Sequence, residues 1–160
     1  TSKVKGRKQV LVAGGVGVPP LVFLSEKSNA DYLLIGTKSK AEVLPKKELR
    51  NVKAEIRYAT NDGSHGTKGF VTVLLEQLIQ KEGARNLYVQ TCGPTVMMNA
   101  VMALARRYGV PGEASMEENM ACGVGTCLGC MIKTDQGWVT CCTEGPVFSF
   151  DRLVCGHASH

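Results

Sequence analysis

Four cysteines gather in the last third of the chain, and their spacing restricts how this part can fold more than any other feature. Cys122, Cys127 and Cys130 follow the pattern C-x4-C-x2-C, and Cys142 comes after a short stretch that reads as a hairpin. This is the plant-type spacing of four thiolates that hold a [2Fe–2S] cluster. Because such a cluster passes single electrons, the cysteine array predicts redox chemistry.

Residues 121–130 form a loop suited to this set of ligands. A cluster needs four convergent thiolates and backbone N–H groups turned toward its sulfur atoms. Such convergence requires unusual dihedral angles, which glycine adopts most easily, and glycine stands at Gly123, Gly125 and Gly129. Structural zinc is the first alternative, but zinc sites usually combine two C-x2-C pairs or Cys with His, and only one such pair occurs here.

Disulfide bonds are the second alternative for so many cysteines. The chain holds seven, an odd number, and its first residues are polar and basic rather than an apolar secretory leader. Reduced thiols that serve as metal ligands fit better, and we expect a cytoplasmic protein. Cys155 lies in a tail with His157 and His160, where a disordered terminus is a better explanation than a second metal site.

The composition is that of an ordinary globular protein. With 160 residues, 44% of them hydrophobic, the chain can bury one good core with a small appendage. The net charge of +5 is spread along the chain, and the densest basic stretch, 38–57, also contains Glu42, Glu48 and Glu55, so we expect no nucleic-acid partner. No apolar run approaches the length of a membrane span, so we expect no membrane partner.

Ahead of the cysteines, short apolar runs alternate with helix-like segments. The patterns predict strands over 9–13, 31–36, 55–60, 86–92 and 112–116, and helices over 19–27, 70–80 and 95–108, the last with Thr95 as its N-cap. This alternation predicts an α/β fold, a parallel five-stranded sheet with helices on both faces. We expect this domain to cover residues 1–116 and a small cluster-binding domain to cover 117–160.

Three loops follow predicted strands and should meet at the carboxyl edge of the sheet, where such folds bind ligands. The first loop contains Gly14, Gly15, Gly17 and Pro19. Its glycines let the backbone approach a phosphate, and the N-terminus of the next helix supplies positive potential. The loop lacks the G-x-G-x-x-G pattern, however, and a tight turn without a ligand explains it as well.

The second loop spans 60–69 and is longer than a simple turn requires. Its Asp62 could accept hydrogen bonds from ribose hydroxyls and would repel a 2′-phosphate, but an Asx turn explains the same residue. The third loop, Cys92-Gly93-Pro94, ends the fourth strand. Cys92 is either a buried thiol at a strand end or a residue packed against a redox ring. Together the three loops predict a nucleotide-binding sheet.

Taken together, these features resemble a known family. The glycine–proline loop, the loop 60–69, the Cys-Gly-Pro turn and a C-terminal cluster are similar to ferredoxin-reductase-type proteins, above all to the electron-transfer subunits of NAD-linked dihydroorotate dehydrogenase. The segment 120–130, MACGVGTCLGC, resembles the cluster loop of those subunits, and 142–148, CTEGPVF, resembles the segment of their fourth ligand. The resemblance covers residues 9–150.

The resemblance implies an electron relay. NADH would reduce FAD, and a [2Fe–2S] cluster would carry single electrons to FMN in a separate catalytic subunit that oxidises dihydroorotate in pyrimidine biosynthesis. Physiologically the electrons run from dihydroorotate to NAD, and a heterotetramer is expected. The implied contacts are Gly14, Gly15, Gly17 and Pro19 for the pyrophosphate, Thr60, Asn61 and Asp62 for the adenosine ribose, and Cys92, Gly93 and Pro94 beside the nicotinamide and flavin.

The fourth cluster ligand needs a choice between two neighbours, Cys141 and Cys142. Spacing alone does not decide it. The resemblance selects Cys142, because in the family the ligand directly precedes the segment that leads into Gly-Pro. On an extended segment Cys141 would then face the opposite side.

The chain departs from the family at its start. Family members normally begin with a β-barrel of about a hundred residues that binds FAD, whereas here the first strand starts near residue 9 and no Arg-x-Tyr-Ser motif occurs. We therefore expect a fragment without the barrel that binds the cluster, holds NAD weakly and retains little FAD. Two other functions remain open: the small subunit of a related relay, such as sulfide dehydrogenase or ferredoxin–NADP reductase, and a zinc-stabilised interaction module without redox activity.

Overall fold

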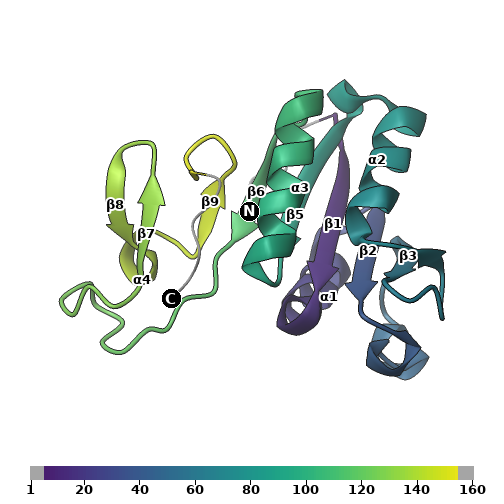
Figure 1. Cartoon of the computed structure of the whole chain (residues 1–160), viewed down its shortest axis with the longest axis horizontal. Coiled ribbons are helices and arrows are strands. Elements are labelled where there is room, and N and C mark those ends of the chain that lie inside the picture. Colours follow the sequence, from purple (N-terminus) through teal and green to yellow (C-terminus); the bar gives the residue numbers. More distant parts are fainter. Residues whose placement is uncertain (1–5, 155–160) are drawn as a thin grey trace.

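The computed structural model describes residues 6–154, so the tail residues Cys155, His157 and His160 lie outside the described part. Five parallel strands form the centre of one sheet, which confirms the predicted fold class (Figure 1). They are β1 (Lys8–Gly14), β2 (Tyr32–Thr37), β3 (Glu55–Thr60), β5 (Leu87–Cys92) and β6 (Gly112–Ser115). Their spatial order is β3-β2-β1-β5-β6. Successive strands are added on one side of β1 up to β3 and then on its other side from β5, so the strand order reverses between β1 and β5, where sheets of this kind bind ligands.

Two short strands widen the sheet beyond the prediction. β4 (Thr67–Lys68) pairs with β3 at one edge, and β9 (Val147–Ser149) pairs antiparallel with β6 at the other. Strands of two or three residues are too short to show a hydrophobic period, which is why the sequence does not reveal them. Since β9 comes from the cysteine-rich part of the chain, that part shares the main sheet.

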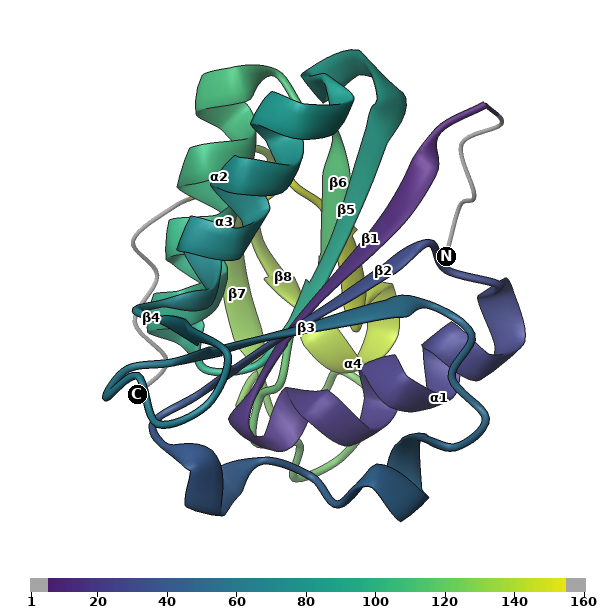
Figure 2. The same ribbon diagram turned by 90° about the vertical axis from the view of Figure 1, so that its right-hand side faces the viewer.

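Helices cover both faces of the sheet, as predicted (Figure 2). α1 (Val18–Ser28) lies on one face, and α2 (Val71–Glu82) and α3 (Thr95–Tyr108) lie on the other. Short 3-10 helices occupy Gly15–Gly17, Lys40–Glu42, Lys46–Leu49 and Ala84–Asn86. None of the helices within residues 6–154 combines the length and the apolarity that a membrane span needs.

The central strands are buried on both faces, and for this reason they read as unbroken apolar runs in the sequence. On β1, Val10 and Val12 pack in the core that contains α2 and α3, whereas Leu11 and Ala13 pack in the core that contains α1. All four side chains are completely buried. The two helical layers thus hold the strand ends, and the loops that follow them, in fixed positions.

The cysteine-rich part folds as a hairpin and a short helix beside the sheet (Figure 1). Its elements are β7 (Met131–Thr134), β8 (Gly137–Thr140) and α4 (Cys141–Glu144). Ile132, Phe148 and Phe150 from this part belong to the same buried core as Val101 of α3. The cysteine-rich part and the nucleotide-binding sheet are therefore packed through one core.

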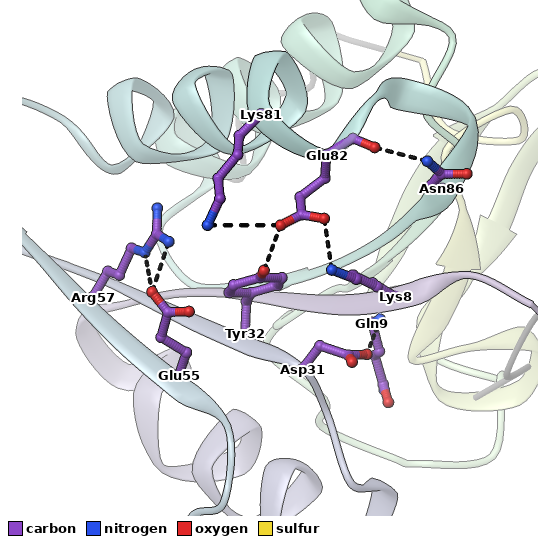
Figure 3. Close-up of polar contacts among 9 residues, drawn as sticks. All are labelled: Lys8, Gln9, Asp31, Tyr32, Glu55, Arg57, Lys81, Glu82 and Asn86. Atoms are coloured by element: carbon purple, nitrogen blue, oxygen red, sulfur yellow. Dashed lines mark hydrogen bonds and ion pairs between the residues drawn. The ribbon is translucent and has the colours of Figure 1, made fainter.

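A polar network ties the end of α2 to the amino-terminal edge of the sheet (Figure 3). The Glu82 carboxylate accepts a hydrogen bond from the Tyr32 hydroxyl at 2.7 Å and pairs with the Lys8 ammonium at 2.6 Å. The hydrogen bond from Lys8 is the main cause that lowers the pKa of Glu82, and the hydrogen bond to Glu82 raises the pKa of Tyr32. Because this network lies at the opposite strand ends from the glycine loop, it supports the fold rather than the site.

Candidate nucleotide and iron–sulfur sites

A cavity opens at the carboxyl ends of the strands, near the point between β1 and β5 where the strand order reverses. Its volume is about 360 Å³, within the usual range for small-molecule sites. Four of the residues predicted to contact a nucleotide line it: Gly14, Gly15, Asn61 and Pro94. They come from all three predicted loops, so the sheet brings these loops to one place.

The other predicted nucleotide contacts lie outside the lining of the cavity. A Cβ atom at Gly17 would collide with the backbone of Cys92 and Gly93, so this glycine permits close packing of two loops. Thr60 is completely buried, and its hydroxyl donates to a carbonyl of the following loop at 2.8 Å. Pro19 is exposed at the start of α1.

Asp62 is held by its own loop. Its carboxylate oxygen Oδ1 accepts hydrogen bonds from the hydroxyl of Ser64 at 2.6 Å and from the amide of Ser64 at 2.9 Å, and these bonds lower the pKa of Asp62. This is the geometry of an Asx turn, the alternative reading of this residue. The Ser64 hydroxyl also accepts a hydrogen bond from the Lys40 amide at 2.8 Å, which joins the loops after β2 and β3.

The loop after β2 was missed by the sequence analysis. Gly36, Thr37, Lys38 and Glu42 line the cavity, and the Glu42 carboxylate accepts a hydrogen bond from the Lys38 amide at 3.0 Å. The end of β2 could have been predicted to contribute to the site, because β2 is the direct neighbour of β1 and the carboxyl ends of parallel strands meet at one edge of the sheet.

Apolar side chains at the starts of α2 and α3 complete the cavity. Phe70 is 68% exposed and Val96 is 82% exposed, and both line the cavity together with Met97. Binding sites for small molecules are commonly lined by apolar and aromatic side chains with a few polar groups among them. Sequence reasoning treated the α2 segment as a core-facing helix and gave no hint of this exposed start.

The β7–β8 hairpin brings Cys130 and Cys142 together. In its register Met131 pairs with Thr140, so the residues just outside the hairpin lie side by side. The Cys142 amide donates a hydrogen bond to the Cys130 sulfur at 3.4 Å. The contact with Cys130 is the first cause that raises the pKa of Cys142.

Cys122 and Cys127 form a second thiol pair. The Cys127 amide donates a hydrogen bond to the Cys122 sulfur at 3.5 Å. The Cys127 amide is the first of several donors that lower the pKa of Cys122 to about 5. A thiol with this pKa is ionised at neutral pH, the form in which it binds metals.

The backbone of the cysteine loop adopts unusual conformations. Gly123 and Gly125 have φ angles of +70° and +80°, and Leu128 has a φ of +58°. Glycine reaches the left-handed region without cost, whereas a leucine is uncommon there and is strained. Such strain concentrates at functional sites, so Leu128 marks the loop as one.

Two further thiols are buried apart from the pairs. Cys141 is completely buried with its sulfur 3.8 Å from the Met116 carbonyl, and burial raises the pKa of Cys141 to about 11. The expected extended segment is wrong, because Cys141 and Cys142 begin the helix α4. Cys92, at the end of β5, is 1% exposed, and burial together with the Glu117 carboxylate 3.4 Å away raises the pKa of Cys92 to about 11.

The thiols of the cysteine-rich part are of the kind that hold an iron–sulfur cluster. Across residues 6–154, no three His, Cys, Asp or Glu side chains gather as ligands of one metal ion. The thiols that contact each other do so as the pairs Cys122–Cys127 and Cys130–Cys142. Because cysteine thiolates are the usual ligands of iron–sulfur clusters, these donors fit such a cluster.

Comparison with known proteins supports an iron–sulfur site in the cysteine-rich part. Residues 117–154 match the family described as the iron-sulfur cluster binding domain of dihydroorotate dehydrogenase B. The dihydroorotate dehydrogenase B (NAD(+)) electron transfer subunit of Desulforamulus reducens is 38% identical over 96% of this chain and 61% of its own length. The same subunit of Clostridium acetobutylicum is 39% identical over 92% of this chain and 57% of its own. A solved structure, the NADH-dependent reduced ferredoxin-NADP oxidoreductase of flavin-based electron bifurcation, matches 96% of this chain and 56% of its own, with a TM-score of 0.78 and 25% identity.

The chain has the fold of ferredoxin-reductase-type proteins, and its paired thiols form a candidate iron–sulfur site. Within this class, residues 117–154 belong to the cluster-binding domain family of dihydroorotate dehydrogenase B, and the chain is a relative of the electron transfer subunits of that enzyme. This confirms the resemblance seen in the sequence. The chain spans about three fifths of the length of the curated relatives it matches, 61% in two of them.

Proposed function

We propose that this chain is the nucleotide- and cluster-binding part of the electron-transfer subunit of an NAD-dependent dihydroorotate dehydrogenase. It passes electrons between an FMN-containing catalytic subunit and NAD through a [2Fe–2S] cluster and FAD, as a step of pyrimidine biosynthesis. The observation that carries the proposal is the attachment of two thiol pairs to a sheet whose strand ends enclose a cavity of about 360 Å³. A nucleotide site and an electron carrier in one core are what such a relay requires.

In this proposal the chain binds NAD mainly through backbone atoms of the loops and through the shape of the cavity. Gly14 and Gly15, which line the cavity, let the backbone approach the pyrophosphate. Asn61 meets the adenosine ribose, and Pro94 lies beside the nicotinamide and flavin. The remaining predicted residues lie in the same three loops but do not line the cavity: Gly17, Pro19, Thr60, Asp62, Cys92 and Gly93.

For the iron–sulfur cluster, the chain provides Cys122, Cys127, Cys130 and Cys142 as ligands. The cluster, when bound, supplies one-electron transfer. Support for Cys142 comes from its amide and thiol contacts with Cys130, whereas the Cys141 sulfur faces the Met116 carbonyl in the core. Cys141 therefore serves packing beneath the site.

The rest of the relay lies beyond this chain. We assign FAD to the part of the relatives that this chain does not span, and we keep the division into a nucleotide-binding domain, 1–116, and a cluster domain, 117–160. The partner is the FMN-containing catalytic subunit, in a cytoplasmic heterotetramer. The name of the relatives, electron transfer subunit, supports a catalytic partner. Exposed apolar side chains in the cysteine loop, Val124 and Leu128, offer it a surface.

The deciding experiment is anaerobic purification of the chain with iron and sulfide analysis and an EPR spectrum after reduction. We expect two iron and two sulfide ions per chain and a spectrum of a reduced [2Fe–2S] cluster. Four irons, or zinc in a colourless protein, would contradict the assignment. Stoichiometric FAD in the isolated chain would contradict the assignment of FAD to the missing part.

Nucleotide binding is tested by calorimetric titration with NAD and NADP. We expect weak binding that prefers NAD and a several-fold loss in Asn61→Ala, which removes an amide from the cavity. Asn51→Ala, which changes an exposed asparagine elsewhere on the surface, is the matched control. Equal binding by both variants would argue against this cavity as the nucleotide site.

A related relay is the second candidate. The structural similarity to a ferredoxin-NADP oxidoreductase, with a TM-score of 0.78, favours a sister system in which the same kind of domain serves another partner. The small subunit of a sulfide dehydrogenase belongs to the same group. Co-expression with an FMN-dependent dihydroorotate oxidase separates these candidates, because only the dihydroorotate relay gives a complex that reduces NAD with dihydroorotate.

A further inference from the structure

A carboxylate lines the nucleotide cavity at a place that the sequence did not indicate. Glu42 ends the short 3-10 helix after β2 and lies in the lining with Thr37 and Lys38. One oxygen of its carboxylate, Oε2, accepts a hydrogen bond from the Lys38 amide at 3.0 Å. The other oxygen, Oε1, accepts no hydrogen bond from residues 6–154. The backbone therefore holds this carboxylate in place and leaves one acceptor open to a ligand.

Hydrogen bonds between backbones join the loop of Glu42 to the loop after β3. The Thr37 carbonyl accepts a hydrogen bond from the Asn61 amide at 3.2 Å, and the Lys38 carbonyl accepts one from the Asp62 amide at 3.3 Å. These bonds continue the parallel pairing of β2 with β3 past the ends of both strands. Glu42 and Asn61 therefore line the cavity together, on its β2–β3 side.

The order of the strands indicates which end of a dinucleotide this side of the cavity receives. Gly14 and Gly15 follow β1 in the middle of the sheet, and Pro94 follows β5 on one side of it. Glu42 and Asn61 follow β2 and β3 on the other side. With the pyrophosphate at the two glycines and the nicotinamide beside Pro94, the adenosine half extends over the ends of β2 and β3. Its ribose carries a 2′-hydroxyl in NAD and a 2′-phosphate in NADP.

We propose that Glu42 is the residue that selects NAD over NADP, a role that the sequence suggests for Asp62. A fixed carboxylate accepts a hydrogen bond from a ribose 2′-hydroxyl and repels a 2′-phosphate of the same charge. Asp62 is less suited, because it does not line the cavity and its Oδ1 already accepts hydrogen bonds from Ser64. The inference rests on the proposed function, in which this cavity binds NAD.

Lys38 brings a positive charge to the same lining. Within residues 6–154 its ammonium forms no ion pair, with Glu42 or with any other carboxylate. This charge attracts the pyrophosphate, which NAD and NADP share, so it favours both nucleotides and does not choose between them. The choice is left to the carboxylate of Glu42.

The test is Glu42→Gln, which removes the charge and keeps an oxygen that can accept the hydrogen bond from the Lys38 amide. Calorimetric titrations with NAD and with NADP give the ratio of the two dissociation constants. We expect the preference for NAD to fall about tenfold, mainly because NADP binds more tightly. The matched control is Glu48→Gln, which removes the charge of an exposed glutamate outside the cavity and should leave the preference unchanged.

A second measurement uses the wild-type chain alone. Salt screens the repulsion between Glu42 and a 2′-phosphate, so the preference for NAD should shrink as the salt concentration rises. An unchanged preference in Glu42→Gln overturns the inference, as does a preference that is lost in Asp62→Asn instead. Lys38→Gln should weaken both nucleotides by a similar factor, and a loss confined to NADP would place Lys38 at the 2′ position and overturn the assignment.

The outcomes separate this inference from the proposed function. A wild-type chain that binds neither nucleotide, or binding that is unaffected by Asn61→Ala, contradicts the proposed nucleotide site. Binding of NAD that depends on Asn61, with the same preference in wild type and in Glu42→Gln, contradicts this inference alone.

Discussion

The central strands and the cysteine loop reach a defined structure in different ways. β1, β2 and β5 lie between two layers of helices, and Leu33 and Leu34 are completely buried. In the loop, Val124 and Leu128 are 67% and 58% exposed, and order comes from backbone N–H groups that point at sulfur atoms. The sheet is therefore specified by burial, and the loop by hydrogen bonds and by the metal it binds.

This difference predicts where each region is vulnerable. Inside the sheet, a single added carbon atom costs stability, because the interior is close-packed. In the loop, a carbon atom added at Gly129 would meet only ordinary van der Waals contacts, but loss of one thiol removes a ligand that no packing can replace. Changes in the sheet should therefore affect folding first, and changes in the loop should affect the cluster first.

The largest expected effect is the loss of the cluster in Cys142→Ala. The variant lacks one of four thiolates, so we expect iron content and the EPR signal of the reduced chain to fall to background. Cys141→Ala is the matched control, since its thiol is buried and faces the Met116 carbonyl, and it should keep both iron and signal. The reverse pattern would identify Cys141 as the ligand.

The next largest effect is expected on stability, in the close-packed sheet region, for the substitution Gly17→Ala. The new methyl group would collide with the backbone of Cys92 and Gly93, and we expect a loss of about 1–3 kcal/mol in the free energy of unfolding, measured in urea. Gly14→Ala is the control, because there the methyl group meets the sulfur end of the Met97 side chain, which can move. A larger loss in Gly14→Ala would show that the two loops do not pack as described.

Thiol labelling compares the two regions directly in the metal-free chain. Cys122 has a pKa of about 5 and Cys92 a pKa of about 11, so at pH 7 the first is ionised and the second is not. We expect iodoacetamide to label Cys122 at least about tenfold faster, as read by mass spectrometry. Because Cys122 is already ionised, its rate should change little between pH 7 and pH 9. Faster labelling of Cys92 would contradict its burial.

The smallest effect is expected at the amino-terminal edge of the sheet, in Glu82→Gln. The lowered pKa of Glu82 means that its ionised form stabilises the folded state at pH values above its ordinary pKa of 4.5, and that this contribution is lost as the pH falls through the lower folded value. We expect the melting temperature at pH 7 to fall by a few degrees, and the difference from wild type to shrink in acid. Glu48→Gln, on an exposed pair, should change little.

The fold was predictable to the extent that burial leaves a pattern in the sequence. The runs 9–13 and 31–36 signal strands that are buried on both faces, and the structure places β1 and β2 there within about a residue or two at each end. The sequence did not predict β9, because its three residues form a strand only by pairing with β6. The expected N-cap was also one residue off, since α3 begins at Thr95 and Pro94 is the capping residue.

The candidate sites were predictable where the spacing of residues in the sequence by itself indicates a ligand set. The interval between Cys122 and Cys130 specifies a cluster loop, and it needs no knowledge of the surrounding fold. The nucleotide cavity depends instead on which strands become neighbours. The sequence therefore did not predict Lys38 and Glu42 as residues that line the cavity, because nothing local in their loop distinguishes it from an ordinary solvated turn.

Because β9 pairs with β6, the cysteine region covers one edge of the main sheet. An uncovered edge strand presents unpaired N–H and C=O groups, which recruit strands from other molecules. A chain cut at residue 116 would expose β6 and leave the core without Phe148 and Phe150. The cysteine-rich segment thus also protects the β6 edge of the sheet from pairing with strands of other molecules.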